Sequence, residues 1–448
     1  ILSAVTYMAL AVPAYAQTPD LYTHEFPQDV KHYSTVTIAS DGQALMAGTT
    51  FNNVGPNGAG QGEIHLIRTE NDATIDMLGS SWRMYDNAFD DTRTVALVAN
   101  TNISNRYYIV AKARPNRSVA GALPATDRDM IRIVQTTNNP IGGTLNAAYI
   151  YENTSNNPSG YRNSMYPTDA VYRYSGGRDL LYICGYFSPD DTRNSTTPQP
   201  DYSHRKEAFV ISVDVTNSNP AAWAVVGKLF FNYTPIMGAQ DNIDYDIAMR
   251  IFVTAADKIF VTGSTNARTG TAPGTGFPQR SATMNLLLEP QLDLHPTPII
   301  VNNPFISLSN IDGYGGYEFG SAFYEDPVNN VKYIAGSYFQ SYGGYSSPLD
   351  PVGFDYLHSF LHITELDNAY NYTDRLISSS PPPPPPPPVT LSHAATAIVS
   401  SILPSDISPA PGNTRFLLTG MMGSIANCVN NSPSGIGPFV FDLELTPG

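Results

Sequence analysis

An acidic stretch is the clearest candidate for metal chemistry in this sequence. Asp241, Asp244 and Asp246 lie within the segment Asp-Asn-Ile-Asp-Tyr-Asp. Carboxylate and loop carbonyl oxygens are hard ligands that suit Ca²⁺, so this segment could bind that ion. A solvated turn before a strand is the alternative, because Asp90 and Asp91 occupy an equivalent position earlier in the chain. Calcium is therefore the one cofactor that the sequence suggests, and no cofactor is required.

Two glycine-rich stretches contain several tyrosines, which we expect on flexible loops. Tyr314 and Tyr317 lie in Gly-Tyr-Gly-Gly-Tyr, and Tyr338, Tyr342 and Tyr345 lie in Tyr-Phe-Gln-Ser-Tyr-Gly-Gly-Tyr. Aromatic rings on flexible loops can stack on sugars or pack against a protein partner. We therefore expect a ligand surface here, with simple coverage of sheet edges as the alternative.

Familiar catalytic motifs are missing from the sequence. It contains no G-x-S-x-G elbow, no H-E-x-x-H pair, no phosphate-binding P-loop and no complete EF-hand loop. His358 and His362 are close in sequence, but in a strand this spacing separates them by about 13 Å, too far for one metal. The sequence thus predicts no catalytic residue, and we expect a protein that is not an enzyme.

The charge balance restricts the partners. The net charge is −15 and only 14% of the residues are charged, so nothing would neutralise the phosphates of a nucleic acid. Beyond the N-terminus no apolar run reaches the roughly 18 residues of a membrane-spanning helix. Cys184 lies in an apolar strand and Cys428 in a polar loop, so we expect a core residue at Cys184 and no disulfide.

The first segment, 1–16, is signal-like. Ile1 to Val12 is apolar, and Ala14 and Ala16 give the small-x-small pattern of a secretory cleavage site. The sequence thus predicts a secreted protein, extracellular or at the cell surface. Alternatively, the segment is retained and adds as a strand to another copy. The assembly residues would then be Ile1, Leu2, Val5, Tyr7 and Leu10.

Sequons and a proline run mark exposed loops. Asn-x-Ser/Thr sequons permit glycosylation in a secreted protein. Residues 381–388 are consecutive prolines, which form a stiff polyproline II arm of roughly 25 Å. The candidate glycosylation positions are Asn102, Asn116, Asn153, Asn194, Asn232, Asn371, Asn430, Pro381, Pro384 and Pro388.

One module recurs six times along the chain. An alternating strand is followed by a second strand that ends in Gly and a turn, and a long loop then leads to a third strand. This alternation favours half-buried or buried strands over helix. The residues that mark the second strands are Gly48, Lys112, Gly185, Gly263, Gly336 and Gly420. Lys112 departs from glycine, so its unit is the least regular.

Fourth strands complete most of these units. They are expected at 82–85, 145–151, 223–231, 298–301 and 375–377, while the sixth unit has none. The unmatched strand Leu21–Phe26 could complete that unit, because closure removes an open sheet edge. The sequence therefore predicts an all-β fold, a six-bladed β-propeller of four-stranded antiparallel blades closed by an N-terminal strand. Two β-sandwiches are the alternative fold.

The predicted domain is single and spans 17–448, with the poly-Pro loop 381–388 exposed. A (V/I/A)-x-G-x-x turn followed by a strand such as Phe-Val-Ile-Ser-Val-Asp, at 209–214, resembles the repeats of secreted bacterial β-propeller proteins. This resemblance implies an architecture and no particular activity. The proline run after Ser380 resembles segments of algal hydroxyproline-rich glycoproteins, which implies glycosylated prolines.

The expected function follows from what is present and what is missing. Loops between second and third strands should emerge on one face, and a localised function is expected there. With no catalytic motif and an apolar N-terminus, we expect a secreted, non-enzymatic structural protein that assembles head to tail into a homo-oligomeric filament or surface layer. A carbohydrate-binding or adhesive propeller that uses the aromatic loops is the first alternative. A glycan-active enzyme is the second.

Overall fold

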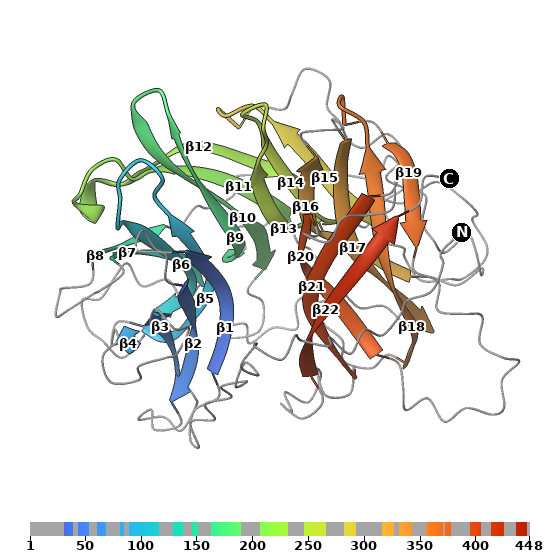
Figure 1. The fold of residues 1–448 in the computed structure, drawn as a ribbon. Coiled ribbons are helices and arrows are strands. Elements are labelled where there is room, and N and C mark those ends of the chain that lie inside the picture. The colour runs from blue at the N-terminus through green and yellow to red at the C-terminus, as the bar shows by residue number, and fades with distance from the viewer. Residues whose placement is uncertain are drawn as a thin grey trace, which may run out of the picture.

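The computed structural model is built almost entirely of β-strands (Figure 1). It describes residues 31–38, 44–52, 61–68, 81–84, 89–115, 129–137, 146–150, 163–189, 207–231, 246–265, 282–292, 316–326, 331–342, 355–370, 372–377, 395–404, 414–424 and 436–445. Within these ranges the strands form six separate antiparallel sheets. No helix in this part of the chain is long and apolar enough to cross a membrane.

Each of the first three sheets has four strands in chain order. Sheet one contains β1 (Lys31–Ile38), β2 (Ala44–Asn52), β3 (Gln61–Arg68) and β4 (Ser81–Met84). Sheet two contains β5 (Phe89–Ala99), β6 (Tyr107–Pro115), β7 (Met130–Thr136) and β8 (Asn146–Ile150). Sheet three contains β9 (Asn163–Ser175), β10 (Arg178–Pro189), β11 (Glu207–Asp214) and β12 (Ala224–Phe231). The short helix η1 (Pro220–Ala222) precedes β12.

The last three sheets keep the same order. Sheet four contains β13 (Asp246–Val253), β14 (Ile259–Thr265) and β15 (Ala282–Leu288). Sheet five contains β16 (Gly316–Asp326), β17 (Val331–Tyr342), β18 (Asp355–Leu366) and β19 (Tyr372–Ile377). Sheet six contains β20 (Ala395–Pro404), β21 (Thr414–Ser424) and β22 (Ile436–Leu445).

The sequence-based prediction of the strands is confirmed for all the first, second and third strands and for four of the five fourth strands. The fourth strand expected at 298–301, the closing strand Leu21–Phe26, segment 1–16 and the proline run 381–388 lie outside the described residues. Six blades and their closure therefore stay a prediction.

Consecutive sheets pack against each other through their first strands. β1 contacts β5, β5 contacts β9, β9 contacts β13, β13 contacts β16, and β16 contacts β20. Strand β11 shows how the core is built: Phe209 and Ile211 pack toward sheet two, while Ala208 and Val210 pack toward sheet four. Because successive side chains of a strand point to opposite faces, this apolar run is buried on both sides. The core therefore consists of apolar layers between sheets.

A β-bulge recurs in the pairing of every first and second strand. In sheet four, Gly263 pairs with Ala248 and the next residue, Met249, is skipped. A Cβ added at Gly263 would lie 1.9 Å from the carbonyl oxygen of Ile247. The repeated glycine thus has a steric cause, since the bulge brings a backbone carbonyl onto the Cα of the second strand.

The register corrects the sequence-based assignment in sheet two. There the skipped residue is Val95, and its preceding neighbour Thr94 pairs with Ala111. Ala111, and not Lys112, therefore stands where the other sheets have glycine. Lys112 lies one residue further along β6, so its side chain points to the opposite face of the strand.

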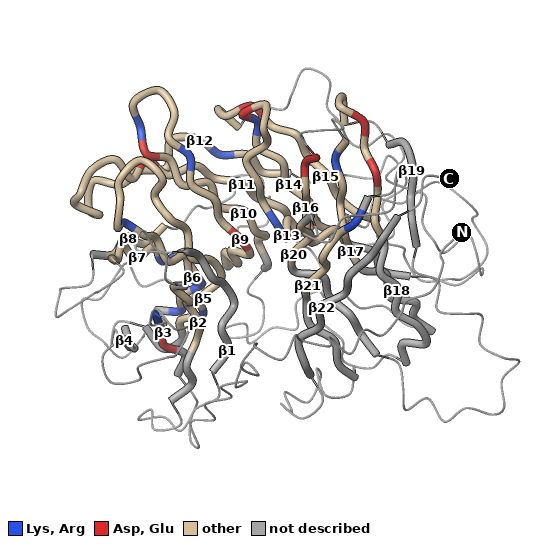
Figure 2. The backbone as a smooth tube through the Cα atoms, viewed as in Figure 1, with Lys and Arg blue, Asp and Glu red and all other residues tan. Residues whose placement is uncertain are grey.

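The antiparallel order gives the sheets two different ends. At the long-loop end, second strands end, third strands begin and first strands begin. At the tight-turn end, first and second strands are joined, as by Gly176 and Gly177 in sheet three and by 254–258 in sheet four. Figure 2 shows that the described Asp and Glu residues gather mostly at the tight-turn end, uppermost in the view.

Candidate functional site

A polar cluster lies between sheets two and three at the long-loop end. It consists of Lys112 and Arg114 near the end of β6, Asp129 directly before β7, Tyr166 near the start of β9, and Tyr186 near the end of β10. We call these five residues the seam cluster. They come from four segments of the chain. The antiparallel order of the strands places these segments at the same end of two neighbouring sheets.

The alternation of β6 places the two cations. Tyr108 and Val110 pack into the core between sheets two and three. Side chains two residues apart share a face of a strand, so Lys112 and Arg114 continue this face beyond the apolar core. The same strand therefore changes from apolar to basic as it reaches the long-loop end.

The bulge in sheet three places the tyrosines. Thr168 is skipped, so that Gly185 pairs with Pro167 and Tyr166 pairs with Tyr186. A Cβ at Gly185 would lie 2.1 Å from the carbonyl oxygen of Tyr166. The missing side chain at Gly185 therefore allows the backbone of Tyr166 to come close, and the two phenol rings become cross-strand neighbours.

Asp129 is the centre of the seam cluster and is only 2% exposed. Its Oδ1 accepts a hydrogen bond from Arg114 Nε at 3.0 Å and its Oδ2 accepts one from Arg114 Nη2 at 3.3 Å. Lys112 Nζ lies 3.7 Å from Oδ2. Fork-shaped pairing of this kind fixes both partners in orientation, so both carboxylate oxygens are engaged by cations.

The backbone of Asp129 joins the two sheets. Its N–H donates to Ser164 Oγ at 3.1 Å, and the N–H of Met165 donates to its carbonyl oxygen at 2.9 Å. Ser164 and Met165 directly precede Tyr166 in β9. The carboxylate, the cations and the tyrosine pair are thus held in one frame by main-chain contacts.

Tyr166 and Tyr186 are stacked and partly exposed. Their ring centroids are 5.1 Å apart at an interplanar angle of 7°, and Lys112 Nζ lies 5.5 Å from the centroid of the Tyr166 ring. Burial, followed by the charge of Asp129 and a hydrogen bond to it, raises the pKa of Tyr166. Burial and Asp129 raise the pKa of Tyr186 to about 12. Both phenols therefore keep their protons at neutral pH, and Tyr166 donates its proton to Asp129 in a hydrogen bond.

The arrangement combines three chemical abilities. The stacked rings offer an apolar surface with a polar rim, which suits a sugar ring. The protonated phenols can donate to an oxygen. Lys112 and Arg114 bring positive charge, which is held beside the carboxylate of Asp129. The seam cluster is therefore equipped to bind a polar, oxygen-rich ligand.

The predicted calcium segment is only partly described. Asp246 is the first residue of β13 and is buried, whereas Asp241 and Asp244 lie outside the described residues. Within the ranges that the structure describes, no group of three or more His, Cys, Asp or Glu residues could hold a metal ion. Calcium binding by the full segment stays a prediction.

The predicted aromatic surface is placed differently from the sequence-based expectation. Tyr317 belongs to β16, and Tyr338 and Tyr342 belong to β17, so these three are strand residues and not loop residues. The pairing of β16 with β17 extends to Gly316 and Gln340, which explains why strands continue into glycine-rich sequence. Tyr314 and Tyr345 lie outside the described residues.

Among the candidate modification and assembly residues, Asn102 is described. It is exposed in the turn between β5 and β6, and its Nδ2 donates to Asp179 Oδ1 at 3.1 Å. The remaining candidates lie outside the described residues: Asn116, Asn153, Asn194, Asn232, Asn371, Asn430, Pro381, Pro384, Pro388, Ile1, Leu2, Val5, Tyr7 and Leu10.

Cys184 is a free, fully buried thiol, which confirms its predicted place in the core. Burial raises the pKa of this thiol. Cys428 lies outside the described residues, so the expectation that it forms no disulfide stays a prediction.

Sequence reasoning missed the seam cluster. It noticed Lys112 only as a departure from glycine and did not select Arg114, Asp129, Tyr166 or Tyr186. One signal was available, since Lys112 and Arg114 extend the period-two pattern of Tyr108 and Val110 with basic residues. The tyrosine pair required the register between β9 and β10, which the sequence does not reveal.

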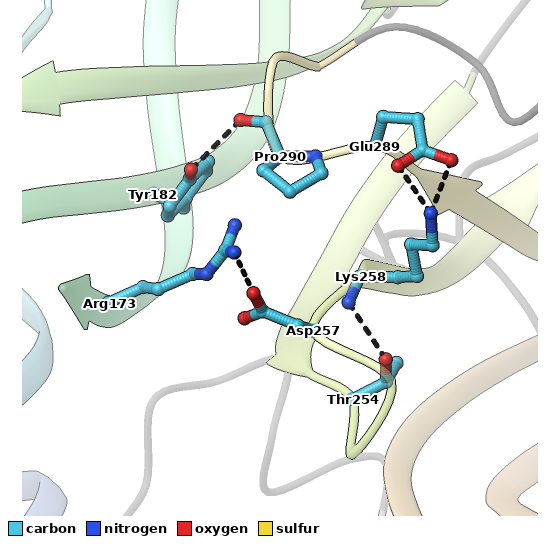
Figure 3. Close-up of polar contacts among 7 residues, drawn as sticks. All are labelled: Arg173, Tyr182, Thr254, Asp257, Lys258, Glu289 and Pro290. Atoms are coloured by element: carbon cyan, nitrogen blue, oxygen red, sulfur yellow. Dashed lines mark hydrogen bonds and ion pairs between the residues drawn. The ribbon is translucent and has the colours of Figure 1, made fainter. Parts of the chain in front are cut away.

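A second polar group lies at the tight-turn end between sheets three and four (Figure 3). Arg173 pairs with Asp257, Lys258 pairs with Glu289, and Tyr182 Oη donates to the carbonyl oxygen of Pro290 at 2.8 Å. We call these residues the turn lock. Each cation in it has a carboxylate partner, so it joins the two sheets without presenting an excess of charge.

Comparisons with known proteins concern the whole fold. No protein-family model matches the chain, and no curated protein sequence matches it. The GH93 α-L-arabinofuranosidase of Fusarium graminearum is 11% identical, with a TM-score of 0.44 over 94% of this chain and 93% of that one. A PL25 ulvan lyase is 10% identical, with a TM-score of 0.44 over 94% and 81%. The sialidase of Trypanosoma rangeli is 10% identical, with a TM-score of 0.39 over 92% and 55%.

These matches contradict the expectation of a non-enzymatic structural protein that assembles into a filament. The matching structures are a glycosidase, a polysaccharide lyase, a sialidase and an inulosucrase. The expectation that the protein is not an enzyme is contradicted by these findings. At this level of similarity no residue role passes from those proteins to this chain.

Proposed function

We propose that this protein is a carbohydrate-active enzyme of β-propeller architecture that binds its glycan over the seam cluster. The observation that carries the proposal is the stacked, partly exposed pair Tyr166–Tyr186 beside Lys112, Arg114 and Asp129. Burial of an aromatic pair against cations and a carboxylate gives both the stacking surface and the proton donors that sugar chemistry needs.

Tyr166 is the proton donor in this proposal. The proton of its hydroxyl, which is donated to Asp129 in the free protein, passes to the leaving sugar oxygen as the bond from that oxygen to carbon breaks, and solvent then returns a proton to the phenolate. Burial and Asp129 raise the pKa of Tyr166 and make it a weaker acid than a free tyrosine, so contacts with the bound glycan must offset this cost. Asp129 acts as a positioning residue, because its two oxygens hold Arg114 and its charge and hydrogen bond orient the phenol. Tyr186 supports the ring of Tyr166 from the neighbouring strand.

The architecture in the proposal is a six-bladed propeller closed by Leu21–Phe26. Support comes from the identical strand order of the sheets and from the succession of contacts between first strands. Tyr166 belongs to such a first strand, so the proposed site lies near the inner edge of the blades. We also propose that the protein is secreted, as the signal-like segment 1–16 suggests.

A carbohydrate-binding protein without catalytic activity is the second candidate. Glycoside hydrolysis by the usual route uses two carboxyl groups. The seam cluster, counted over the described side chains, contains one carboxylate, Asp129, and cations engage both of its oxygens. This composition favours binding and proton donation by a phenol over hydrolysis that uses two carboxylates.

The test is cleavage of a polysaccharide panel by the full chain. Product is measured both as new reducing ends and as absorbance of unsaturated sugars, so that hydrolysis and elimination are both detected. We expect Tyr166→Phe to lower the rate about 100-fold, the size of one general acid contribution. Binding without any product would favour the second candidate. If the chain neither binds nor cleaves any polysaccharide of the panel, the proposal is wrong.

A further inference from the structure

The bulge in sheet three also sets the direction of a second carboxyl group, that of Asp169. Thr168 is skipped in the pairing of β9 with β10, so Asp169 pairs with Cys184, two rows from the pair Tyr166–Tyr186. Residues two apart share a face of a strand, and directly opposite residues share a face of the sheet. Asp169 therefore lies on the same face of sheet three as Tyr166, about 7 Å further along the strand.

Strand β13 of sheet four holds Asp169 in place. The N–H of Ile251 donates to Asp169 Oδ2 at 3.2 Å, and Arg250 Nη1 lies 3.7 Å from Asp169 Oδ1. The hydroxyl of the bulged Thr168 donates to the carbonyl oxygen of Ala248 at 2.7 Å. These contacts fix β9 against β13 and hold a carboxyl group and a guanidinium group side by side.

The two groups are adjacent but not hydrogen-bonded to each other, because 3.7 Å is too long for an N–H···O bond. Within the described part of the chain, Arg250 donates no other hydrogen bond. Its side chain is 28% exposed and that of Asp169 is 15% exposed, so a ligand can reach both. Burial raises the pKa of Asp169, and the charge of Arg250 opposes this shift.

We propose that Asp169 and Arg250 bind a hydroxyl group of a neutral sugar, beside the sugar that contacts Tyr166. This inference rests on the proposed function and deepens it, because it assigns the class of sugar that this part of the site takes. A guanidinium group only donates hydrogen bonds, and carboxyl oxygens accept them. A hydroxyl group does both, so its oxygen accepts from Arg250 while its proton is donated to Asp169.

Charge favours a neutral sugar over an acidic one at this position. The charge of Arg250 is balanced by that of Asp169, so the pair has no excess charge to offer. A sugar carboxylate placed between them would be attracted by the guanidinium and repelled by the carboxylate. The net charge of −15 adds to the repulsion of a polyanion.

The experiment measures binding of polysaccharides to the full chain by calorimetry. Dextran, galactan, arabinan and xylan are neutral, and polygalacturonate carries a carboxylate on each sugar. We expect at least one neutral polymer to bind, about tenfold or more tightly than polygalacturonate, a modest difference of one contact. Tighter binding of polygalacturonate than of every neutral polymer would overturn the inference.

Variants locate the binding. Arg250→Met and Asp169→Asn should each weaken binding of the neutral polymer about tenfold, the size of one hydrogen bond to a charged group. Because both act on one hydroxyl group, the double variant should lose about 30-fold instead of about 100-fold. Arg250→Lys keeps the charge beside Asp169 but loses the planar donors, so it should also weaken binding, and it serves if Arg250→Met does not fold.

A second pair of the same residue types supplies the matched control. Arg178 Nε lies 3.9 Å from Asp214 Oδ2, and both residues belong to sheet three, but they lie at its tight-turn end. Arg178→Met and Asp214→Asn should leave binding unchanged. Equal losses in the control variants and in the variants of Arg250 and Asp169 would overturn the inference.

Steady-state kinetics separate this contact from the proton donor. An interaction that substrate and transition state share raises KM when it is removed and leaves kcat unchanged. We expect this result for Arg250→Met, whereas Tyr166→Phe should lower kcat. A lower kcat with unchanged KM in Arg250→Met would contradict a binding role.

The outcomes separate the inference from the proposed function. If a polymer is cleaved and Tyr166→Phe lowers the rate, but Arg250→Met and Asp169→Asn bind it as tightly as the native chain, the inference is wrong while the proposed function stands. If these two variants weaken binding but Tyr166→Phe cleaves normally, the inference stands and the proton donor is wrong. If no polymer binds or is cleaved, both fail.

Discussion

The seam cluster and the turn lock are two polar contacts between neighbouring sheets, and they differ in how their carboxylates are used. In the turn lock Arg173 pairs with Asp257 and Lys258 pairs with Glu289. In the seam cluster Lys112 and Arg114 share one carboxylate, Asp129. The first arrangement gives each cation its own carboxylate, and the second gathers two cations on one buried carboxylate beside two partly exposed tyrosines.

The difference lies in the ends of the sheets at which the two groups sit. In the turn lock, the short turn 254–258 brings Asp257 to Arg173 of β9 and Lys258 to Glu289, the residue after β15. The seam cluster lies where the chain leaves the sheets for long loops. Binding residues occur disproportionately on loops, and for this reason the long-loop end is where we propose that a ligand binds.

The largest expected effect comes from removing the central carboxylate of the seam cluster. Asp129→Ala leaves Lys112 and Arg114 beside a buried site without its anion, and breaking a buried pair in this way costs about 3–5 kcal/mol of unfolding free energy. Urea denaturation measures the change. The control is Asp214→Ala, because Asp214 lies 3.9 Å from Arg178, which is 59% exposed, and such pairs contribute about 0–1 kcal/mol. Equal losses in both variants would contradict the central role of Asp129.

A matched pair of tyrosine variants tests whether the two regions have different roles. Tyr166→Phe and Tyr182→Phe each delete one phenol hydroxyl that makes a hydrogen bond, so each should lose about 1 kcal/mol of stability. Only Tyr166→Phe should also lower glycan cleavage, about 100-fold. Urea denaturation and product assays on both variants measure the two effects. A comparable loss of activity in Tyr182→Phe would remove the functional distinction between the regions.

Alkaline pH should weaken the seam cluster through Tyr186. Its pKa is raised to about 12 by burial and by Asp129, whereas a tyrosine in the unfolded chain titrates near 10. The protonated phenol therefore favours the fold fully below about pH 10, and this stability is lost as the pH rises to about 12. Tyr186→Phe should show a shallower loss of unfolding free energy over this range. If the unfolding free energy of the variant fell as steeply with pH as that of the native chain, another group would cause the alkaline loss. Tyr182 is one such group, because burial also raises its pKa.

The sequence predicts the sheets well because each strand carries its own signal. The glycine of the second strand, as at Gly263, marks a bulge whose carbonyl excludes a side chain, and that steric requirement acts locally. It also explains the one error of register. In sheet two Ala111 stands at this position. A search for glycine finds none there, so the neighbouring Lys112 is wrongly taken as the marker of the second strand.

The candidate site is harder to predict from the sequence than the strands, because it depends on contacts between sheets. Asp129 lies directly before a strand, and nothing in its neighbourhood indicates that Arg114 and Ser164 will meet it. The stacking of Tyr166 on Tyr186 depends on a bulge at Thr168. Motif searches fail here because the residues are dispersed over four segments and follow no fixed spacing.

The smallest expected effect concerns the Lys258–Glu289 pair of the turn lock, in which each side chain is 26% exposed. A double-mutant cycle with Lys258→Met and Glu289→Gln should give a coupling of about 0.2–1 kcal/mol, and high salt should reduce it because exposed charges are screened. The same cycle with Arg114→Met and Asp129→Asn should give a larger coupling that salt changes less, since Asp129 is only 2% exposed. If the two couplings were equal and equally sensitive to salt, burial of the carboxylate would not distinguish the seam cluster from the turn lock.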